Sequence, residues 1–236
     1  MIKVDLHTHS GEDPEDGLAY PASALVDRAV ALGFGALSVT LHNAVLEDPR
    51  LFDYARQRGL LLVRGVEWQS PRGDVLLYNV SQREFERLQT LDDLRFLRRE
   101  RGNGVLIVAA HPYFIRHSLH RWTERYIEVF DAIEYSHMHF PWLNLNRKAV
   151  QVAARYGKPV VANSDAHNLW MFGQHYTLVD ADATVESLFA GIRAGRLQLH
   201  SPPVNLWFLF RSLVADPLLM RRPGRIIRSF EPGAGQ

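Results

Sequence analysis

The first ten residues read MIKVDLHTHS (residues 1–10), so that a short apolar strand runs directly into two histidines, His7 and His9. In an extended chain, residues i and i+2 lie on the same face, and these two imidazoles can therefore bind one metal ion from the same side. The same order, a buried strand followed by a metal-binding side chain, recurs along the chain. This repetition decides the fold that the sequence predicts.

Short apolar runs alternate with amphipathic helix patterns over most of the chain. We expect strands at 2–6, 36–41, 60–66, 75–80, 105–110, 132–135 and 160–162, and helices at 21–32, 49–58, 81–101, 141–156 and 184–194. The Pro-Arg-Gly-Asp turn at 71–74 predicts a hairpin between the third and fourth strands. Apolar strands that alternate with helices favour an α/β fold with a parallel sheet, and about seven such units favour a closed or nearly closed barrel.

The composition of the 236-residue chain narrows its class. The length suggests one large domain or two small ones, and an apolar fraction of 47% is enough for a substantial core. The absence of cysteine excludes disulfides, a thiolate nucleophile, iron–sulfur clusters and cysteine-ligated zinc. A formal net charge of +1 makes nucleic acid an unlikely partner. Since neither a targeting segment nor a transmembrane segment is visible, we expect a soluble cytoplasmic protein.

Metal-competent side chains follow six of the expected strands in order: His7 and His9, then His42, Glu67, His111, His137, and finally Asp165 and His167. Active sites of β/α barrels are assembled at the carboxyl ends of the strands. A single histidine near a strand end is usually structural, but six such placements together predict a metal site. Because all donors are nitrogen or oxygen, the set suits zinc, manganese or iron and does not choose between them.

The segment Asp5-Leu6-His7-Thr8-His9-Ser10 resembles the first motif of the PHP (polymerase and histidinol phosphatase) family. So do His42, Glu67 in Gly65-Val66-Glu67, and His111-Pro112, while Ser164-Asp165-Ala166-His167 resembles the closing Asp-x-His motif. This resemblance covers roughly residues 1–200. It implies a distorted seven-stranded (β/α)7 barrel over residues 1–202, with 203–236 as a short appended C-terminal segment. It also implies two or three divalent metal ions and a metal-dependent phosphoesterase activity.

Carried over by position, the resemblance implies three metal sites. The first would use His7, His9, Glu67 and Asp165. Glu67 would bridge to a second ion held by His111 and His137. The third would use His42, His167 and an acidic residue of the 11–17 loop.

Two positions depart from the family pattern. The family often has an aspartate before the histidine of the second strand, where this chain has Leu41, so a supporting carboxylate is absent there. The 11–17 loop is also longer and more acidic than usual. Asp16 of Asp16-Gly17 matches the family best, with Asp13 and Glu12 as alternatives, and His139 is an alternative to His137.

We expect hydrolysis of a small phosphorylated metabolite or nucleotide by a hydroxide that bridges the metal ions. Asp165 would act as ligand and proton acceptor, and His167 or His42 would polarise a phosphate oxygen through the third ion. Arg116, five residues after His111, is the first candidate for a cation that clamps the phosphate.

Three other functions stay open. An exonuclease-like phosphodiesterase on nucleic acid is favoured only by the arginine-rich C-terminal end. An amidohydrolase would need a lysine between its metals, and none of the three lysines follows a candidate ligand strand. A non-catalytic, metal-stabilised interaction module would be expected to lack some of the metal ligands, whereas this chain has a nearly complete set.

The C-terminal segment itself predicts two kinds of contact. Leu206, Leu209, Phe210 and Leu213 have helical spacing, so they can pack on the barrel or form a homo-oligomer contact. With the flanking arginines, the segment can instead rest on an anionic membrane surface. We favour packing or an oligomer contact.

Overall fold

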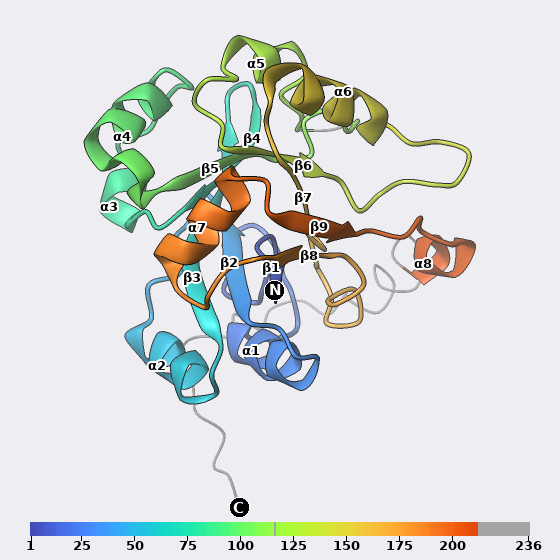
Figure 1. Ribbon diagram of the computed structural model, residues 1–236. Helices are drawn as coiled ribbons and strands as arrows, with labels where there is room; N and C mark the ends of the chain where they lie inside the picture. Colours follow the sequence, from blue (N-terminus) through green and yellow to red (C-terminus); the bar gives the residue numbers. More distant parts are fainter. Residues whose placement is uncertain (116, 212–236) are drawn as a thin grey trace, which may run out of the picture.

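Nine strands form one sheet in the computed structural model, which describes residues 1–115 and 117–211 (Figure 1). Along the chain they are β1 (Ile2–Asp5), β2 (Ala36–His42), β3 (Leu61–Ser70), β4 (Gly73–Tyr78), β5 (Leu106–Ala109), β6 (Ala132–Tyr135), β7 (Val160–Ala162), β8 (Tyr176–Val179) and β9 (Leu197–His200). The spatial order is β7-β6-β5-β4-β3-β2-β1-β8-β9. The sheet is nearly closed, because the Thr177 hydroxyl of β8 accepts a hydrogen bond from the Ala162 N–H of β7 (2.9 Å) and donates one to its carbonyl (2.8 Å).

The sheet is mixed and barrel-like, so the expected α/β barrel is confirmed in its general form, whereas the expected number of seven strands is wrong. Strands β1, β2 and β3 pair in parallel, as do β5, β6 and β7, whereas β4 is antiparallel to both β3 and β5. The turn between β3 and β4 is too short for a crossover, and this permits only the hairpin that the sequence predicted. Strands β8 and β9 pair antiparallel beside β1 and were not expected.

The helices are α1 (Ala22–Ala31), α2 (Pro49–Gln57), α3 (Gln82–Phe85), α4 (Asp93–Arg101), α5 (Arg121–Arg125), α6 (Asn146–Tyr156), α7 (Val185–Arg193) and α8 (Leu206–Phe210), with a 3-10 turn at Gly102–Gly104. The expected helix at 81–101 is two helices. Its capping box is confirmed, since Ser81 and Glu84 exchange hydrogen bonds. The break follows because the Asp93 carboxylate accepts hydrogen bonds from the Gln89 and Thr90 N–H groups (2.9 and 2.7 Å), which closes a turn before α4.

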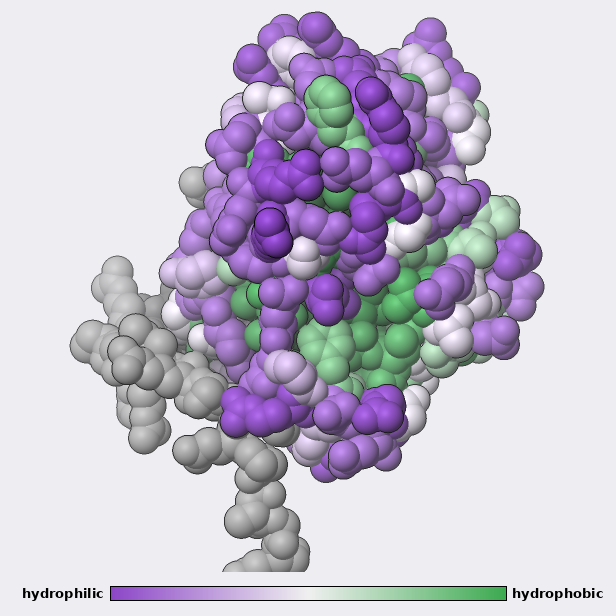
Figure 2. Space-filling model, turned by 90° about the vertical axis from the view of Figure 1, so that its left-hand side faces the viewer, coloured by the Kyte–Doolittle hydropathy of each residue, from purple (hydrophilic) through white to green (hydrophobic). Residues whose placement is uncertain are grey.

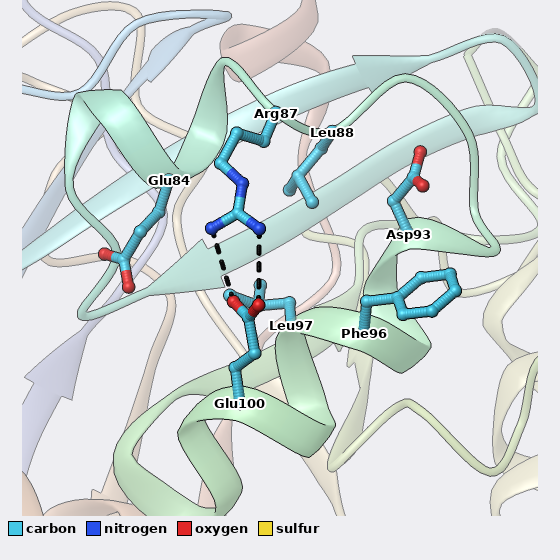
Figure 3. Close-up of a pocket in the computed structure, with 7 residues that line it drawn as sticks. All are labelled: Glu84, Arg87, Leu88, Asp93, Phe96, Leu97 and Glu100. Atoms are coloured by element: carbon cyan, nitrogen blue, oxygen red, sulfur yellow. Dashed lines mark hydrogen bonds and ion pairs between the residues drawn. The ribbon is translucent and has the colours of Figure 1, made fainter.

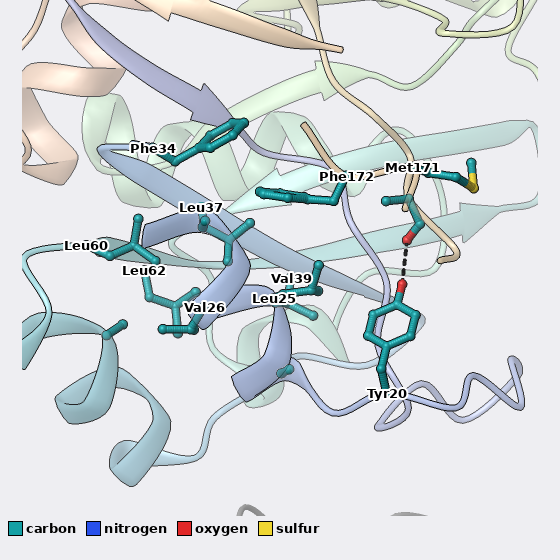
Figure 4. Close-up of a cluster of buried hydrophobic side chains, with 14 of the residues drawn as sticks. Tyr20, Leu25, Val26, Phe34, Leu37, Val39, Leu60, Leu62, Met171 and Phe172 are labelled. Carbon is teal, nitrogen blue, oxygen red and sulfur yellow. Dashed lines mark hydrogen bonds between the residues drawn. The ribbon is translucent and has the colours of Figure 1, made fainter. Parts of the chain in front are cut away.

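A hydrophobic core lies between α1, β2 and β3 and reaches the loop after β7 (Figure 4). Leu25 and Val26 of α1 pack with Leu37 of β2, and Phe172 closes the cluster. The hydroxyl of Tyr20, at the edge of this core, donates to the carbonyls of His9 (2.8 Å) and Ala166 (3.0 Å). The core therefore fixes the two loops that carry the first and last metal-binding motifs.

Two hollows of the surface lie away from these loops. One, between α3 and α4, is lined by Phe96 and crossed by the Arg87–Glu100 ion pair at 3.2 Å (Figure 3). The other, of about 420 Å³, lies between α2 and the residues before α7 and is lined mainly by apolar side chains of 52–62. Figure 2 shows that the face bearing α2, α3 and α4 is mostly hydrophilic around one apolar area. Neither hollow contains a predicted site residue.

Helix α8 packs on the barrel mainly through Phe208, and the ring of Trp207 also contacts Trp170 edge-on (5.6 Å between ring centroids). Phe208 is 3% exposed and lies against Trp170, with ring centroids 5.1 Å apart. Leu206, Trp207 and Phe210 point outward and are more than half exposed. Leu213 and the arginines beyond Arg211 lie outside the described residues. Over the described part of the chain, no helix combines the length and apolar character that crossing a membrane requires.

Candidate metal centre

The histidines after β1 meet two carboxylates at the carboxyl end of the parallel strands. His7 Nε2 and His9 Nε2 lie 3.1 and 3.2 Å from Glu67 Oε2, and 3.4 and 3.3 Å from Asp165 Oδ1. His7, His9 and Glu67 are almost completely buried. The structure thus brings together the four residues expected at the first metal site.

Glu67 presents its two oxygens to different imidazoles. Oε2 lies 3.2 Å from His42 Nε2, in addition to its contacts with the histidines of the first motif, whereas Oε1 lies 3.2 Å from His111 Nε2. Its position follows from the sheet, because Glu67 of β3 pairs directly with His42 of β2. A carboxylate between two groups of donors has the geometry that a bridging ligand requires.

The three acidic candidates of the 11–17 loop occupy different positions relative to the histidines. Asp16 Oδ2 lies 3.1 Å from His167 Nε2 and, with His9 and His42, forms a group of ligand atoms all within 4.8 Å of one another. Asp13 lies behind the histidines instead. Its Oδ2 is 3.2 Å from His9 Nδ1 and 3.0 Å from His42 Nδ1, and it accepts a hydrogen bond from the His42 N–H (2.8 Å). Glu12 accepts a hydrogen bond from the Ala22 N–H at the start of α1.

The two histidines after β6 point in different directions. His137 Nδ1 lies 3.9 Å from Asp165 Oδ2, and its ring faces Phe208 of α8. His139 Nε2 lies 3.1 Å from the Ser201 carbonyl and is turned away from the other ligands. Among the described residues, no group of ligand atoms within 4.8 Å includes His137, so it stands at the edge of the cluster on the Asp165 side.

Three buried carboxylates at this centre were not predicted from the sequence. Glu134 of β6 lies 3.0 Å from His7 Nδ1 and accepts a hydrogen bond from the His111 N–H (2.9 Å). Its signal was a charged residue inside an apolar strand. Asp5 accepts hydrogen bonds from the N–H groups of His7 (3.3 Å) and Ser164 (3.2 Å). Asp74 Oδ2 lies 4.0 Å from His111 Nε2, and no strand-end pattern could have found it.

The excess of carboxylates changes the charge state of the imidazoles. Burial alone would lower the pKa of His7, but the charges of Glu67 and Glu134 raise this pKa well above its usual value. Burial also opposes charge on His111, yet the hydrogen bond and charge of Glu67 raise its pKa to about 9. Burial lowers the pKa of His137 to about 4. Burial together with the charge of Glu67 raises the pKa of Asp74 to about 7.

The donor set fits divalent cations. The Nε2 atoms of His7 and His9 are buried without a hydrogen-bond partner and face carboxylate oxygens. Buried polar atoms that lack hydrogen bonds are costly unless a ligand satisfies them. Three residues of the centre or beside it also have positive φ, namely His111 at 24°, Asp165 at 48° and Asn43 at 53°. Such backbone strain in residues other than glycine is typical of functional sites.

One predicted residue could not be placed. Arg116, the expected phosphate clamp, lies outside the described residues. His117 and Ile115 on either side of it line a hollow beside the β3–β4 hairpin, together with Arg72.

The comparisons with known proteins bear on this same centre. The model of the PHP-associated family matches residues 144–197, which include β7 and Asp165. Over this segment the chain is similar to the PHP-associated family. Among curated proteins, none matches the sequence.

Several solved structures share this fold at low sequence identity. PsfC from Pseudomonas syringae is 17% identical, with a TM-score of 0.59 over 93% of this chain and 97% of PsfC. The lesion-specific endonuclease EndoQ from Pyrococcus furiosus is also 17% identical, with a TM-score of 0.59 over 84% of this chain. This match spans 57% of EndoQ. A protein from Bifidobacterium adolescentis described as a metal-dependent phosphoesterase is 15% identical, with a TM-score of 0.50 over 70% of this chain and 87% of that one.

Proposed function

We propose that this chain is a metal-dependent phosphoesterase that hydrolyses a small phosphorylated metabolite or nucleotide. The observation that carries the proposal is the position of Glu67, whose two oxygens face His7, His9 and His42 on one side and His111 on the other. The match of residues 144–197 to the PHP-associated family and the fold shared with a metal-dependent phosphoesterase support the same activity.

The residues that would hold the ions are His7, His9, Glu67 and Asp165 at a first site, Glu67, His111 and His137 at a second, and Asp16, His42 and His167 at a third. When bound, divalent ions would supply a water of lowered pKa as nucleophile and neutralise charge on the phosphoryl group. Zinc, manganese and iron all accept imidazole and carboxylate ligands.

The protein's own contribution begins with the tautomers of its histidines. Glu134 faces Nδ1 of His7, and Asp13 faces Nδ1 of both His9 and His42. A carboxylate at Nδ1 keeps the proton there and leaves the Nε2 lone pair for a cation. All three Nε2 atoms face Glu67, so the imidazoles are already oriented before any ion binds.

Asp165 and His167 are the groups that reach toward substrate. Their side chains are 22% and 36% exposed, whereas those of His7 and His9 are fully buried. His167 Nδ1 donates a hydrogen bond to the Asp165 carbonyl (3.0 Å), which leaves the Nε2 lone pair of His167 for a cation. Arg116 stays our candidate for the cation that orients the phosphate.

A phosphodiesterase that acts on nucleic acid is the second candidate. Two structures of endonuclease Q share the fold, one of them in complex with a 27-mer duplex that carries an abasic lesion. The near-neutral charge of this chain favours a small substrate instead.

A substrate panel tests the proposal. Protein loaded with Mn²⁺ or Zn²⁺ is assayed on phosphomonoesters, small phosphodiesters and an oligonucleotide with an abasic site, after elemental analysis of its metal content. We expect at least one bound ion per chain and turnover of small esters. Asp165→Asn should reduce kcat by at least about a hundredfold, since it removes a ligand and proton acceptor. Asp53→Asn, on the exposed face of α2, is the matched control.

The outcomes separate the candidates. Cleavage of the oligonucleotide alone would support the nuclease instead. Less than one ion per chain together with no turnover on any ester would contradict both enzymatic functions.

A further inference from the structure

Strand β4 delivers a carboxylate to the metal centre from an unexpected direction. Because β4 runs antiparallel between β3 and β5, its first residues lie at the edge where its neighbours end. Asp74, its second residue, pairs with Gln69 near the end of β3. On its other side, the Asp74 carbonyl accepts a hydrogen bond from the Ala110 N–H, next to His111. A residue at the start of an antiparallel strand thus stands beside residues at the ends of parallel strands.

Asp74 and Glu67 lie on the same face of the hairpin. Glu67 pairs with Leu76, two residues after Asp74, and alternate residues of a strand share a face. The two acidic residues are therefore diagonal neighbours on adjacent strands. Ligand atoms of Glu67, Asp74 and His111 all lie within 4.8 Å of one another. Glu67 contributes to this group through Oε1, the oxygen that faces away from His7 and His9.

The Asp74 carboxylate lacks the partners that a buried charge requires. The residue is 4% exposed, and Oδ1 is a buried oxygen with no hydrogen bond. Its backbone is fixed, because the Asp74 N–H donates to the His117 carbonyl (2.8 Å) while its own carbonyl is paired with Ala110. Desolvating a carboxylate without compensation is expensive, and a bound cation offsets that cost.

We propose that Asp74 is a ligand of the second metal ion, together with Glu67 and His111. This inference rests on the metal centre of the proposed function and adds a carboxylate that the family resemblance does not include. His137, which lies 3.9 Å from Asp165, would be a further ligand of the same ion, as the family resemblance implies. With Glu67, Asp74, His111 and His137, the second site would have two carboxylates and two imidazoles, the same donor composition as the first, and this set accepts manganese, zinc or iron.

Metal binding by the purified protein tests this role without a substrate. The chelator-treated full chain is titrated with Mn²⁺ alone. The number of bound ions is measured by elemental analysis and by the decrease in the concentration of unbound Mn²⁺. Asp74→Asn should lose about one equivalent of Mn²⁺, or bind it at least about tenfold more weakly. Asp53→Asn, an exposed carboxylate on α2, should match the wild-type protein.

Thermal unfolding separates ligand loss from misfolding. In the metal-free protein, Asp74→Asn removes an unpartnered buried carboxyl group, so its Tm should equal or exceed that of the wild type. Added Mn²⁺ should raise the Tm of the wild type more than that of the variant.

Wild-type stoichiometry and affinity in Asp74→Asn would overturn the proposal. The readout is independent of catalysis. A loss of Mn²⁺ in the variant, with no ester hydrolysed by the wild type, would keep Asp74 as a ligand and reject the phosphoesterase.

Discussion

Asp13 holds two candidate metal ligands with one oxygen. Its Oδ2 lies within 3.2 Å of Nδ1 of both His9 and His42. Its Oδ1 accepts hydrogen bonds from the N–H groups of Glu15 (2.9 Å) and Asp16 (3.2 Å), so the carboxylate also shapes the loop that carries Asp16. Burial would raise the pKa of Asp13, but its hydrogen bonds to the two imidazoles hold this pKa far below its usual value.

Replacing Asp13 should weaken metal binding without touching a metal ligand. In Asp13→Ala, His9 and His42 lose the group that keeps their protons on Nδ1. We expect about a 10- to 100-fold loss of affinity for Mn²⁺, as is usual when a carboxylate behind a ligating histidine is removed. Titration of the chelator-treated protein measures the change.

Glu15→Gln is the control for Asp13, since Glu15 stands in the same loop and its side chain is solvent-accessible. Its affinity for Mn²⁺ should equal that of the wild type. If Asp13→Ala bound Mn²⁺ as tightly as Glu15→Gln, the two imidazoles would not depend on this carboxylate.

At the level of secondary structure, the pattern of apolar residues was sufficient to predict the strands that are buried on both faces of the sheet. The strands at 132–135 and 160–162 match β6 and β7 at both ends. Strands β8 and β9 were missed because β8 alternates half-buried and buried residues and β9 is largely exposed, so neither forms a continuous buried apolar run. The helix at 141–156 begins only at 146, because the Asn144 side chain accepts a hydrogen bond from the Asn146 N–H and turns the chain there.

The residues of the metal centre likewise divide into those that the sequence could predict and those that it could not. Residues that follow parallel strands, such as His42 and Glu67, could be grouped from the sequence because strand order alone brings their ends together. Asp74 could not, since its place depends on the direction of β4. The sequence also left open which acidic residue of the 11–17 loop faces which imidazole. That choice between Asp13 and Asp16 is made by the path of the loop.

The β3–β4 hairpin should be sensitive at one glycine. Gly73 has φ of 132°, and a Cβ there would lie 2.5 Å from the Leu119 backbone nitrogen. Gly73→Ala must therefore displace either Asp74 or the loop that follows His111. An alanine at positive φ costs roughly 1–2 kcal/mol of folding free energy, and the clash should make the loss in Gly73→Ala larger than this. We also expect weaker Mn²⁺ binding. Chemical denaturation and Mn²⁺ titration measure the two effects.

Gly59→Ala is the control that measures the cost of an alanine at positive φ in the absence of a steric clash. Gly59 has φ of 74°, but no atom lies within 4 Å of the position of an added Cβ. This variant should lose about 1–2 kcal/mol and keep its metal affinity. Equal losses in the two variants, with unchanged Mn²⁺ binding in both, would show that the hairpin does not hold Asp74 in place.

Across the whole molecule, the metal centre makes the metal-free fold bind extra protons. The carboxylates around His7, His9 and His42 raise the pKa of these groups against the effect of burial, and the pKa of His111 rises to about 9 from 6.5. The unfolded chain releases these protons near pH 6.5, so the folded state binds more protons above that pH. Each unit of such a shift corresponds to about 1.4 kcal/mol.

The stability of the metal-free protein should therefore fall as the pH rises from 6.5 to about 9. A histidine with a raised pKa stabilises the fold fully below its pKa in the unfolded chain, and this stabilisation is lost as the pH rises through its pKa in the folded state. Mn²⁺ should reverse the trend, since it replaces the protons on the imidazoles and binds more tightly as they leave. Thermal unfolding at several pH values, with chelator and with Mn²⁺, measures both curves. A Tm that rose over this range with chelator would mean that His7, His9 and His111 are neutral in the metal-free fold, and the carboxylates would then not be paired with imidazolium groups.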